Sequence, residues 1–205
     1  MQPMLHPASE LRYVSPEIGY GVFATRFIPK GTFTWVFDPL DQVIPQAKMN
    51  RMPPTLQQAL DKYSYFSGRG DRILCWDHSR FVNHSCNPTS LAPGFDLEIA
   101  VRDIEEGEQV TEDYGSLNLE TPFPCACGSR NCRGTIGPGD FDLYSQRWDA
   151  LVAEAFTFIE RVEQPLWDLV AEKAAIKRVL AGEMQPPSCR VHFLERANAR
   201  GGTAF

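Results

Sequence analysis

The chain has 205 residues and a formal net charge of −6. These values argue against several large domains and against a protein that binds DNA without specificity, because such proteins display a basic excess. No apolar run reaches the roughly 18 residues that a membrane-spanning helix requires, and residues 1–7 do not resemble a secretory signal. We therefore expect an intracellular protein of a reducing compartment, cytoplasm or nucleus, with no membrane contact and no direct nucleic-acid binding.

Short β-prone runs dominate the first part of the chain and indicate a compact α+β fold. Residues 20–36 predict a hairpin whose turn is the Pro-Lys-Gly sequence at 29–31. Residues 54–62 predict a short helix, because their apolar side chains share one helical face and a proline stands at the start. Further strands are expected at residues 63–66, 72–76 and 97–103.

The composition becomes helical after residue 139. Apolar residues recur at three- and four-residue spacing through residues 141–162, which predicts a long amphipathic helix. Pro165 is expected to start a second helix that ends before Gly182. Residues 140–183 should therefore form a helical hairpin. Its apolar face would pack on the β-rich part of the chain or support a homodimer.

Three of the six cysteines lie within residues 125–134, at spacings too short for ordinary disulfides with one another. The same spacing suits thiolates that converge on one zinc ion, and a reducing compartment favours metal thiolates over disulfides. A tetrahedral site needs a fourth ligand, for which Cys86 is the best donor and His84 the competing one. Spacing alone does not decide between them, and a cysteine-rich turn without metal is the alternative. Cys75 and Cys189 are expected to be free buried thiols.

Other candidate residues carry weaker signals of ligand binding. The Gly-Tyr-Gly sequence at residues 19–21 would let a ligand approach the backbone closely, or it marks an ordinary turn. Neither a dinucleotide-binding nor a P-loop pattern is complete there. Asn83 offers a donor and an acceptor to a zwitterionic ligand, or it caps a turn. Tyr114 would orient a reacting amine, or it is an amphipathic core residue.

Taken in order, several motifs resemble those of SET-domain protein lysine methyltransferases that end in a post-SET zinc segment; they are residues 19–24, 80–88, 100–104 with 107–115, and 125–134. The resemblance covers residues 18–136. It implies a β-rich SET fold of the β-clip type, in which the segments around Asn83 and Tyr114 meet in a knot-like core. The implied organisation is a SET domain at 10–120, with the helix at about 54–62 inserted in it, and a post-SET zinc segment at 121–137. The resemblance does not reach the helical hairpin at 140–183, which the apolar periodicity predicts, or the loose tail at 184–205 with its short strand at 190–194.

The resemblance also implies roles for the site residues. S-adenosyl-L-methionine would be held by the backbone of Gly19, Tyr20 and Gly21, by Asn83 and His84, and at its edge by Tyr63. Zinc would be held by Cys86, Cys125, Cys127 and Cys132. Tyr114 matches the catalytic tyrosine. It would orient the amine of a lysine in a basic protein or peptide while a methyl group is transferred in line from the sulfonium.

Two residues depart from the family pattern. Glu112 stands where members commonly have Phe or Tyr, a position that helps to set the number of methyl groups added. It would point away, pair with the incoming ammonium group or change the substrate pocket, and an acid there raises the pKa of lysine and opposes its deprotonation. Thr89 stands where the family often has Asn. Because of Glu112, the alternative function is a catalytically weak SET module that binds peptides or partner proteins through the acidic face and the C-terminal helices. Methylation of another nucleophile is a third.

Overall fold

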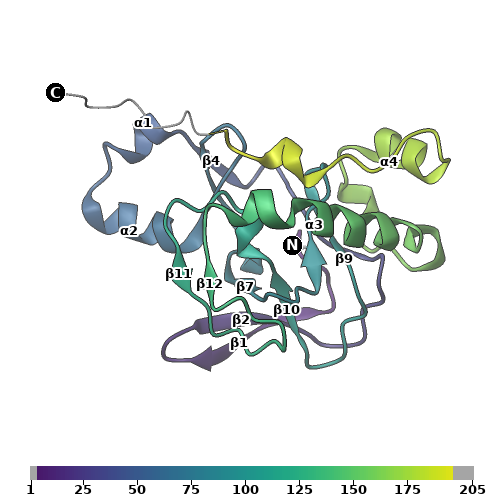
Figure 1. The fold of residues 1–205 in the computed structure, drawn as a ribbon, viewed down its shortest axis with the longest axis horizontal. Helices are drawn as coiled ribbons and strands as arrows, with labels where there is room; N and C mark the ends of the chain where they lie inside the picture. Colours follow the sequence, from purple (N-terminus) through teal and green to yellow (C-terminus); the bar gives the residue numbers. More distant parts are fainter. Residues whose placement is uncertain (1–3, 196–205) are drawn as a thin grey trace.

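The computed structural model describes residues 4–195 and arranges their short strands in four small sheets (Figure 1). The largest sheet has the order β1 (Ser9–Ser15), β2 (Gly19–Ala24), β10 (Gln109–Glu112) and β7 (Asn83–His84). The other sheets are β3 (Phe33–Val36), β9 (Leu97–Ala100) and β8 (Ser90–Leu91); β4 (Gln42–Ile44), β6 (Arg72–Leu74) and β5 (Tyr65–Phe66); and the pair β11 (Phe123–Pro124) and β12 (Thr135–Ile136). Among these described strands, only β7 and β10 pair in parallel.

The hairpin predicted at residues 20–36 is wrong. β2 pairs with β1 and β10, whereas β3 pairs with β9 in another sheet. Between them Ile28 and Ile104 exchange backbone hydrogen bonds of 2.9 Å, and Gly31 turns the chain at φ +91°. A Cβ at Gly31 would lie 2.6 Å from the Cβ of Phe158, so glycine is required at this turn. Sequence alternation identified the strands, but their partners depend on distant segments.

The inserted helix is confirmed, since α2 spans Pro54–Tyr63 with proline in its first turn and follows the short α1 (Gln46–Met49). The strands expected around residues 63–66, 72–76 and 97–103 are also present, as the shorter β5, β6 and β9. Helices α1 and α2 lie at the opposite end of the molecule from α4 (Lys173–Leu180) (Figure 1).

The long helix predicted after residue 139 is present as α3 (Asp140–Phe156), which packs on the β3-β9-β8 sheet. Acidic residues in its first turn favour the helix N-terminus electrostatically. Its buried apolar side chains share one core with residues of the sheet and of α4. This core includes Phe141, Trp148, Val152 and Phe156 from α3, Phe33, Leu97 and Ile99 from the sheet, and Ile176 from α4. The apolar stripe is therefore buried within the chain, and a homodimer through these helices stays a prediction.

The second arm of the predicted hairpin needs correction. The first arm also ends earlier than residue 162, because α3 stops at Phe156 and the 3₁₀ helix η3 (Ile159–Arg161) follows it. Instead of one helix from Pro165, the chain then forms the 3₁₀ helix η4 (Trp167–Leu169) before α4 begins at Lys173. The Gln164 side chain explains this course. Its amide nitrogen donates to the Gly31 carbonyl at 2.7 Å and its amide oxygen accepts from the Phe33 N–H at 2.9 Å. These bonds fix the segment against the start of β3.

The prediction of a loose tail does not hold for residues 184–195. A 3₁₀ helix, η5 (Cys189–His192), replaces the strand expected at 190–194. The N–H of the buried Cys189 donates to Asp149 at 2.8 Å, and the Leu194 N–H donates to Asn118 at 2.8 Å. The rest of the predicted tail, residues 196–205, lies outside the described residues. No helix within residues 4–195 combines the length and apolar character of a membrane span.

Candidate functional site

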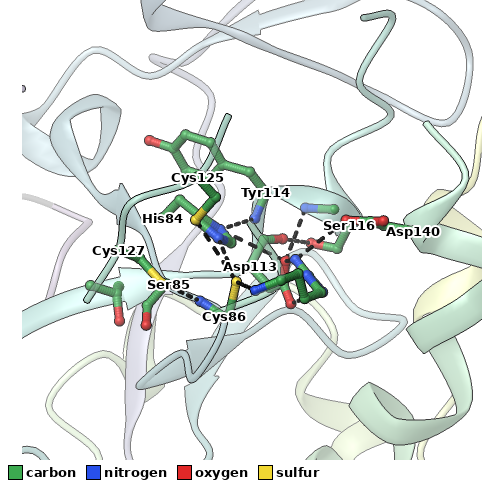
Figure 2. A network of polar contacts seen from close by, with 12 residues as sticks. His84, Ser85, Cys86, Asp113, Tyr114, Ser116, Cys125, Cys127 and Asp140 are labelled. Atoms are coloured by element: carbon green, nitrogen blue, oxygen red, sulfur yellow. Dashed lines mark hydrogen bonds and ion pairs between the residues drawn. The ribbon is translucent and has the colours of Figure 1, made fainter. Parts of the chain in front are cut away.

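The candidate site forms where β7 and β10 run in parallel, because this pairing places His84 beside the strand that leads to Tyr114 (Figure 2). Glu112 is the register partner of His84. The Tyr114 backbone N–H donates to Nδ1 of His84 at 3.1 Å, and the Ser85 N–H donates to the Glu112 carbonyl at 2.9 Å. The segments around Asn83 and Tyr114 thus meet, while the knot-like threading of one past the other stays a prediction.

The Tyr114 side chain is held by a short hydrogen bond, in which its hydroxyl donates to the Val82 carbonyl at 2.6 Å. Burial raises the pKa of Tyr114, and the nearby carboxyl groups of Glu112 and Glu98 raise it further. The phenol is therefore neutral at physiological pH. Because its proton is committed to Val82, its oxygen lone pairs are available to accept a hydrogen bond from another donor.

Most of the predicted cofactor residues lie on two strands of the largest sheet, with Gly19, Tyr20 and Gly21 on β2 and Asn83 and His84 on β7. The Asn83 amide nitrogen donates to the Tyr20 carbonyl at 3.0 Å and to Oε1 of Gln109 at 2.7 Å. A Cβ at Gly21 would lie 2.8 Å from that nitrogen, so Asn83 can take this position only beside a glycine. Gly19 needs its glycine for another reason, since its φ is +84°. The sequence did not single out Gln109, which fixes the Asn83 side chain.

A row of aromatic rings connects the remaining cofactor candidates. The Tyr20 ring centre lies 5.9 Å from that of Phe81, which lies 5.5 Å from that of Tyr63. Both contacts are edge-on, an arrangement that favours aromatic pairs. Tyr63 is thereby joined to the strand that carries Tyr20. Phe81 was missed as a site residue, although it stands in the motif at residues 80–88.

The predicted zinc ligands are gathered beside His84, and Figure 2 shows the imidazole facing the sulfur atoms. Sγ of Cys125 lies 3.9 Å from Sγ of Cys86 and 3.7 Å from Sγ of Cys132. A tetrahedron with Zn–S bonds of about 2.3 Å has sulfur–sulfur edges of about 3.8 Å. The donor set and its spacing therefore fit one zinc ion.

Both candidates for the fourth ligand are present in this cluster. The ligand atoms of His84, Cys86, Cys125 and Cys127 all lie within 4.8 Å of one another. Nε2 of His84 is 3.3 Å from Sγ of Cys86, while Cys132 approaches the cluster through Cys125. Burial lowers the pKa of His84, which favours the neutral imidazole that a metal requires. His84 therefore directs its side chain to the cysteines, and its part in cofactor binding stays a prediction.

Asp113 connects Tyr114 with the cysteine-rich segment and with α3. Its buried carboxylate accepts a forked pair of hydrogen bonds from Arg133, at 3.0 and 2.5 Å, and one from the Trp148 indole at 3.1 Å. The Arg133 guanidinium also lies over the Tyr144 ring, 4.4 Å from its centre. The sequence missed this network, because its members are far apart in the chain. Charge-assisted forked bonds of this kind hold both position and orientation.

We expect Trp148→Phe to lower the free energy of unfolding by about 2 kcal/mol, because it removes a hydrogen bond to a buried charge. Trp167→Phe is the matched control, since the Trp167 ring stacks on Phe33 and its indole makes no hydrogen bond within the described chain. Urea unfolding of both variants measures the difference. Equal losses in the two would show that the bond to Asp113 contributes nothing beyond ring size.

A cavity of about 1190 Å³ lies beside Tyr114. Its aromatic walls include Trp35, Phe37, Tyr63, Tyr65 and Phe123. Phe123, on β11, packs edge-on against the rings of both His84 and Tyr114, with centres 6.3 Å apart in each pair. Glu112 and Glu98 also line the cavity, and Glu112 is only 7% exposed. Glu112 therefore does not point away from the candidate substrate pocket.

Comparison with known proteins gives the following matches. Residues 19–115 match the family model described as SET domain. The human histone-lysine N-methyltransferase SETD1B is 37% identical over 73 residues, which are 32% of this chain and 4% of that protein. The Arabidopsis thaliana histone-lysine N-methyltransferase ASHR3 is 41% identical over 66 residues, 29% of this chain and 13% of that protein. The chain thus matches only a small part of these relatives. The solved methyltransferase domain of human SETMAR has a TM-score of 0.42 and 22% identity, over 60% of this chain and 55% of that one.

Proposed function

We propose, from the SET domain that this chain carries at residues 19–115, that the protein is an S-adenosylmethionine-dependent methyltransferase acting on a lysine side chain of a basic protein or peptide. The observation that carries the proposal is the position of Tyr114. Its backbone is bonded to His84 and its hydroxyl to Val82, on either side of Asn83, and its ring faces an aromatic cavity. This position supports the proposal, because the group that would orient an amine lies next to the surface that would hold its methyl donor.

The chain's own residues would perform the transfer by positioning. When bound, S-adenosylmethionine supplies a methyl group on a positively charged sulfur. Tyr20, Gly21 and Asn83 would hold it, with Asn83 fixed by its bonds to Tyr20 and Gln109. The free lone pairs of the Tyr114 hydroxyl would accept an N–H of the amine and aim its nitrogen at the methyl group.

Deprotonation of the lysine is the electrostatic problem that the pocket must solve. An amine with a pKa near 10.4 loses its proton at pH 7 at a cost of about 4 to 5 kcal/mol. Aromatic walls lower that cost because a poorly solvated ammonium group is disfavoured. The carboxyl groups of Glu98 and Glu112 act in the opposite direction. Because the carboxyl groups favour the ammonium form, a second candidate function is that the same cavity binds a peptide with weak or no methyl transfer.

The cysteine cluster would serve as a structural zinc site. It joins residues 84–86 to residues 125–132, and so presses Phe123 and Arg133 against the Tyr114 region. All six cysteines are free thiols in the described chain. Such a thiolate cluster suits a reducing intracellular compartment, and we propose the cytoplasm or nucleus.

Incubation of the purified chain with methyl-labelled S-adenosylmethionine and a lysine-rich protein extract tests the function. We expect label in methylated lysine after hydrolysis of the proteins, and far less label at equal incubation time with Tyr114→Phe. Label in another amino acid or in small molecules would point to a different nucleophile. Lack of label, together with measurable binding of lysine peptides, would favour the binding module.

A further inference from the structure

A second cavity, of about 330 Å³, lies between the N-terminal segment, the connection from β2 to β3 and the connection from η3 to η4. Among the described residues it shares no wall residue with the cavity beside Tyr114. Its volume is at the lower end of the range for pockets that hold small ligands. Its polar wall residues are His6, Arg26, Thr32 and Glu163. The proposed function leaves all four without a role.

His6 offers this cavity a hydrogen-bond donor. The residue is only 5% exposed, and its Nδ1 accepts a hydrogen bond from the Ala8 N–H at 3.1 Å. Burial, followed by the charge of Arg26, lowers the pKa of His6 to about 4, so the imidazole is neutral at physiological pH. A neutral ring that accepts through Nδ1 carries its proton on Nε2. This N–H has no hydrogen-bond partner within residues 4–195, although His6 lines the cavity.

Thr32 adds a second polar group to the same wall. The residue is 1% exposed, and its enclosed hydroxyl has no hydrogen-bond partner among the described residues. The Thr32 carbonyl accepts from the Ala100 N–H at 2.8 Å, which fixes the backbone here. Buried polar groups are normally hydrogen-bonded. Two unsatisfied groups in one wall therefore indicate that the cavity takes a polar molecule.

Two opposite charges at this cavity indicate what that molecule carries. Arg26 and Glu163 are exposed, and neither side chain forms an ion pair within the described part of the chain. Arg26 lies near His6, because its charge acts on that imidazole, whereas Glu163 comes from the connection between η3 and η4. Water would satisfy the two donors, but a ligand with one charge of each sign would also match the separate charges.

The remaining walls of the cavity are apolar. They are formed by Phe27, Pro29 and Pro165. Phe27 is 49% exposed, which is unusual for a phenylalanine in a chain with two buried cores. A ligand with a small apolar side chain would cover part of this ring and remove apolar surface from water.

We propose that this cavity binds the zwitterion of an α-amino acid with a small apolar side chain. The ligand carboxylate accepts hydrogen bonds from Nε2 of His6 and from the Arg26 guanidinium, which are charge-assisted and therefore strong. The ligand ammonium group faces Glu163, and the side chain packs on Phe27 and the two prolines. The inference does not depend on the proposed function, because no residue of the cavity beside Tyr114 takes part.

Calorimetric titration of the full chain with three molecules of related carbon skeleton tests the site. L-Leucine carries both charges, 4-methylpentanoate lacks the ammonium group and 3-methylbutylammonium lacks the carboxylate. We expect L-leucine to bind at least about tenfold more tightly than either single-charge analogue. Its binding should also shift the imidazole resonances of His6, which lines the cavity.

Two single substitutions test the two ends of the ligand. Arg26→Gln should reduce the affinity for L-leucine at least about tenfold and leave that for 3-methylbutylammonium unchanged. Glu163→Gln should also weaken L-leucine binding, but it should not weaken binding of 4-methylpentanoate. Arg147→Gln and Glu160→Gln are the matched controls, because these exposed residues carry the same charges outside the cavity wall.

All four substituted side chains are exposed, so each variant should keep the melting temperature of the wild type. Absence of L-leucine binding at about 10 mM would overturn the site. Binding that survives Arg26→Gln, or that leaves the His6 resonances unchanged, would lie elsewhere on the chain and would overturn it as well. Equal affinity for L-leucine and 4-methylpentanoate would contradict the zwitterion.

Discussion

Tyr114→Phe should lower kcat for methyl transfer on the order of 100-fold while leaving the affinity for S-adenosylmethionine nearly unchanged. The substitution removes the oxygen that would aim the amine, and this contact matters more in the transition state than in the ground state. It also removes the hydrogen bond to Val82, which should reduce stability by only about 1 kcal/mol. Steady-state methyl transfer and calorimetric titration of the cofactor measure the two effects separately.

Asn83→Ala is the matched comparison for Tyr114→Phe. The Asn83 side chain is bonded to Tyr20 and Gln109 on the candidate cofactor surface, so its loss should weaken cofactor binding first. Its effect on kcat at saturating cofactor should be the smaller one. Full turnover by Tyr114→Phe, on a substrate already shown to accept methyl at lysine, would remove the catalytic assignment and leave the binding module ahead.

Removal of zinc should release about one metal ion per chain and loosen the segment from Cys125 to Arg133 before the rest of the fold. Structural zinc sites contribute on the order of 10 kcal/mol of apparent folding free energy, and β11 and β12 are only two residues each. Their few backbone hydrogen bonds cannot replace that contribution. Metal analysis and hydrogen exchange, before and after chelation, give the stoichiometry and the order of loss.

Cys86 and His84 both lie in the cluster with Cys125 and Cys127, so the open question is whether His84 or Cys132 completes the zinc site. Single substitutions should decide it. Cys86→Ser and Cys125→Ser should both abolish tight binding, because these sulfur atoms lie on a tetrahedral edge of 3.9 Å. His84 and Cys132 are the candidates for the last position. Of His84→Gln and Cys132→Ser, the variant that loses more zinc affinity identifies the ligand. Cys75→Ser is the control, since Cys75 is a buried free thiol outside the cluster. Reduced protein that contains no zinc would refute the site.

The sequence predicted best those features that lie close together in the chain. The spacing of Cys125, Cys127 and Cys132 identified the cluster, and a proline-initiated apolar stripe identified α2. The meeting of Asn83 with Tyr114 could be predicted only from the family resemblance, because pairing between β7 and β10 leaves no local pattern. The second C-terminal helix was predicted too long because its start depends on contacts that are distant in the sequence. Gln164 contacts Gly31 and Phe33, which lie 133 and 131 positions away in the sequence.

Buried polar residues were the hardest to predict. Glu98 alternates with Leu97 and Ile99 on β9, a pattern typical of a side chain that faces solvent, but it faces a cavity. Asp113 stands in an acidic stretch and gave no sign that Arg133 and Trp148 would enclose its carboxylate. A charge whose partner is supplied by a distant segment has the same sequence signature as a charge in water.

Under the proposed function, Phe123 would give the cysteine-rich lobe a part in substrate selection. The ring belongs to the lobe, since β11 runs directly into Cys125, yet it forms a wall of the cavity and packs against Tyr114. A chain deprived of zinc would keep its cofactor surface on β2 and β7 but lose one side of the pocket for the target side chain. Under the proposed function, loss of zinc would therefore change which side chains the pocket accepts while most of the fold persists.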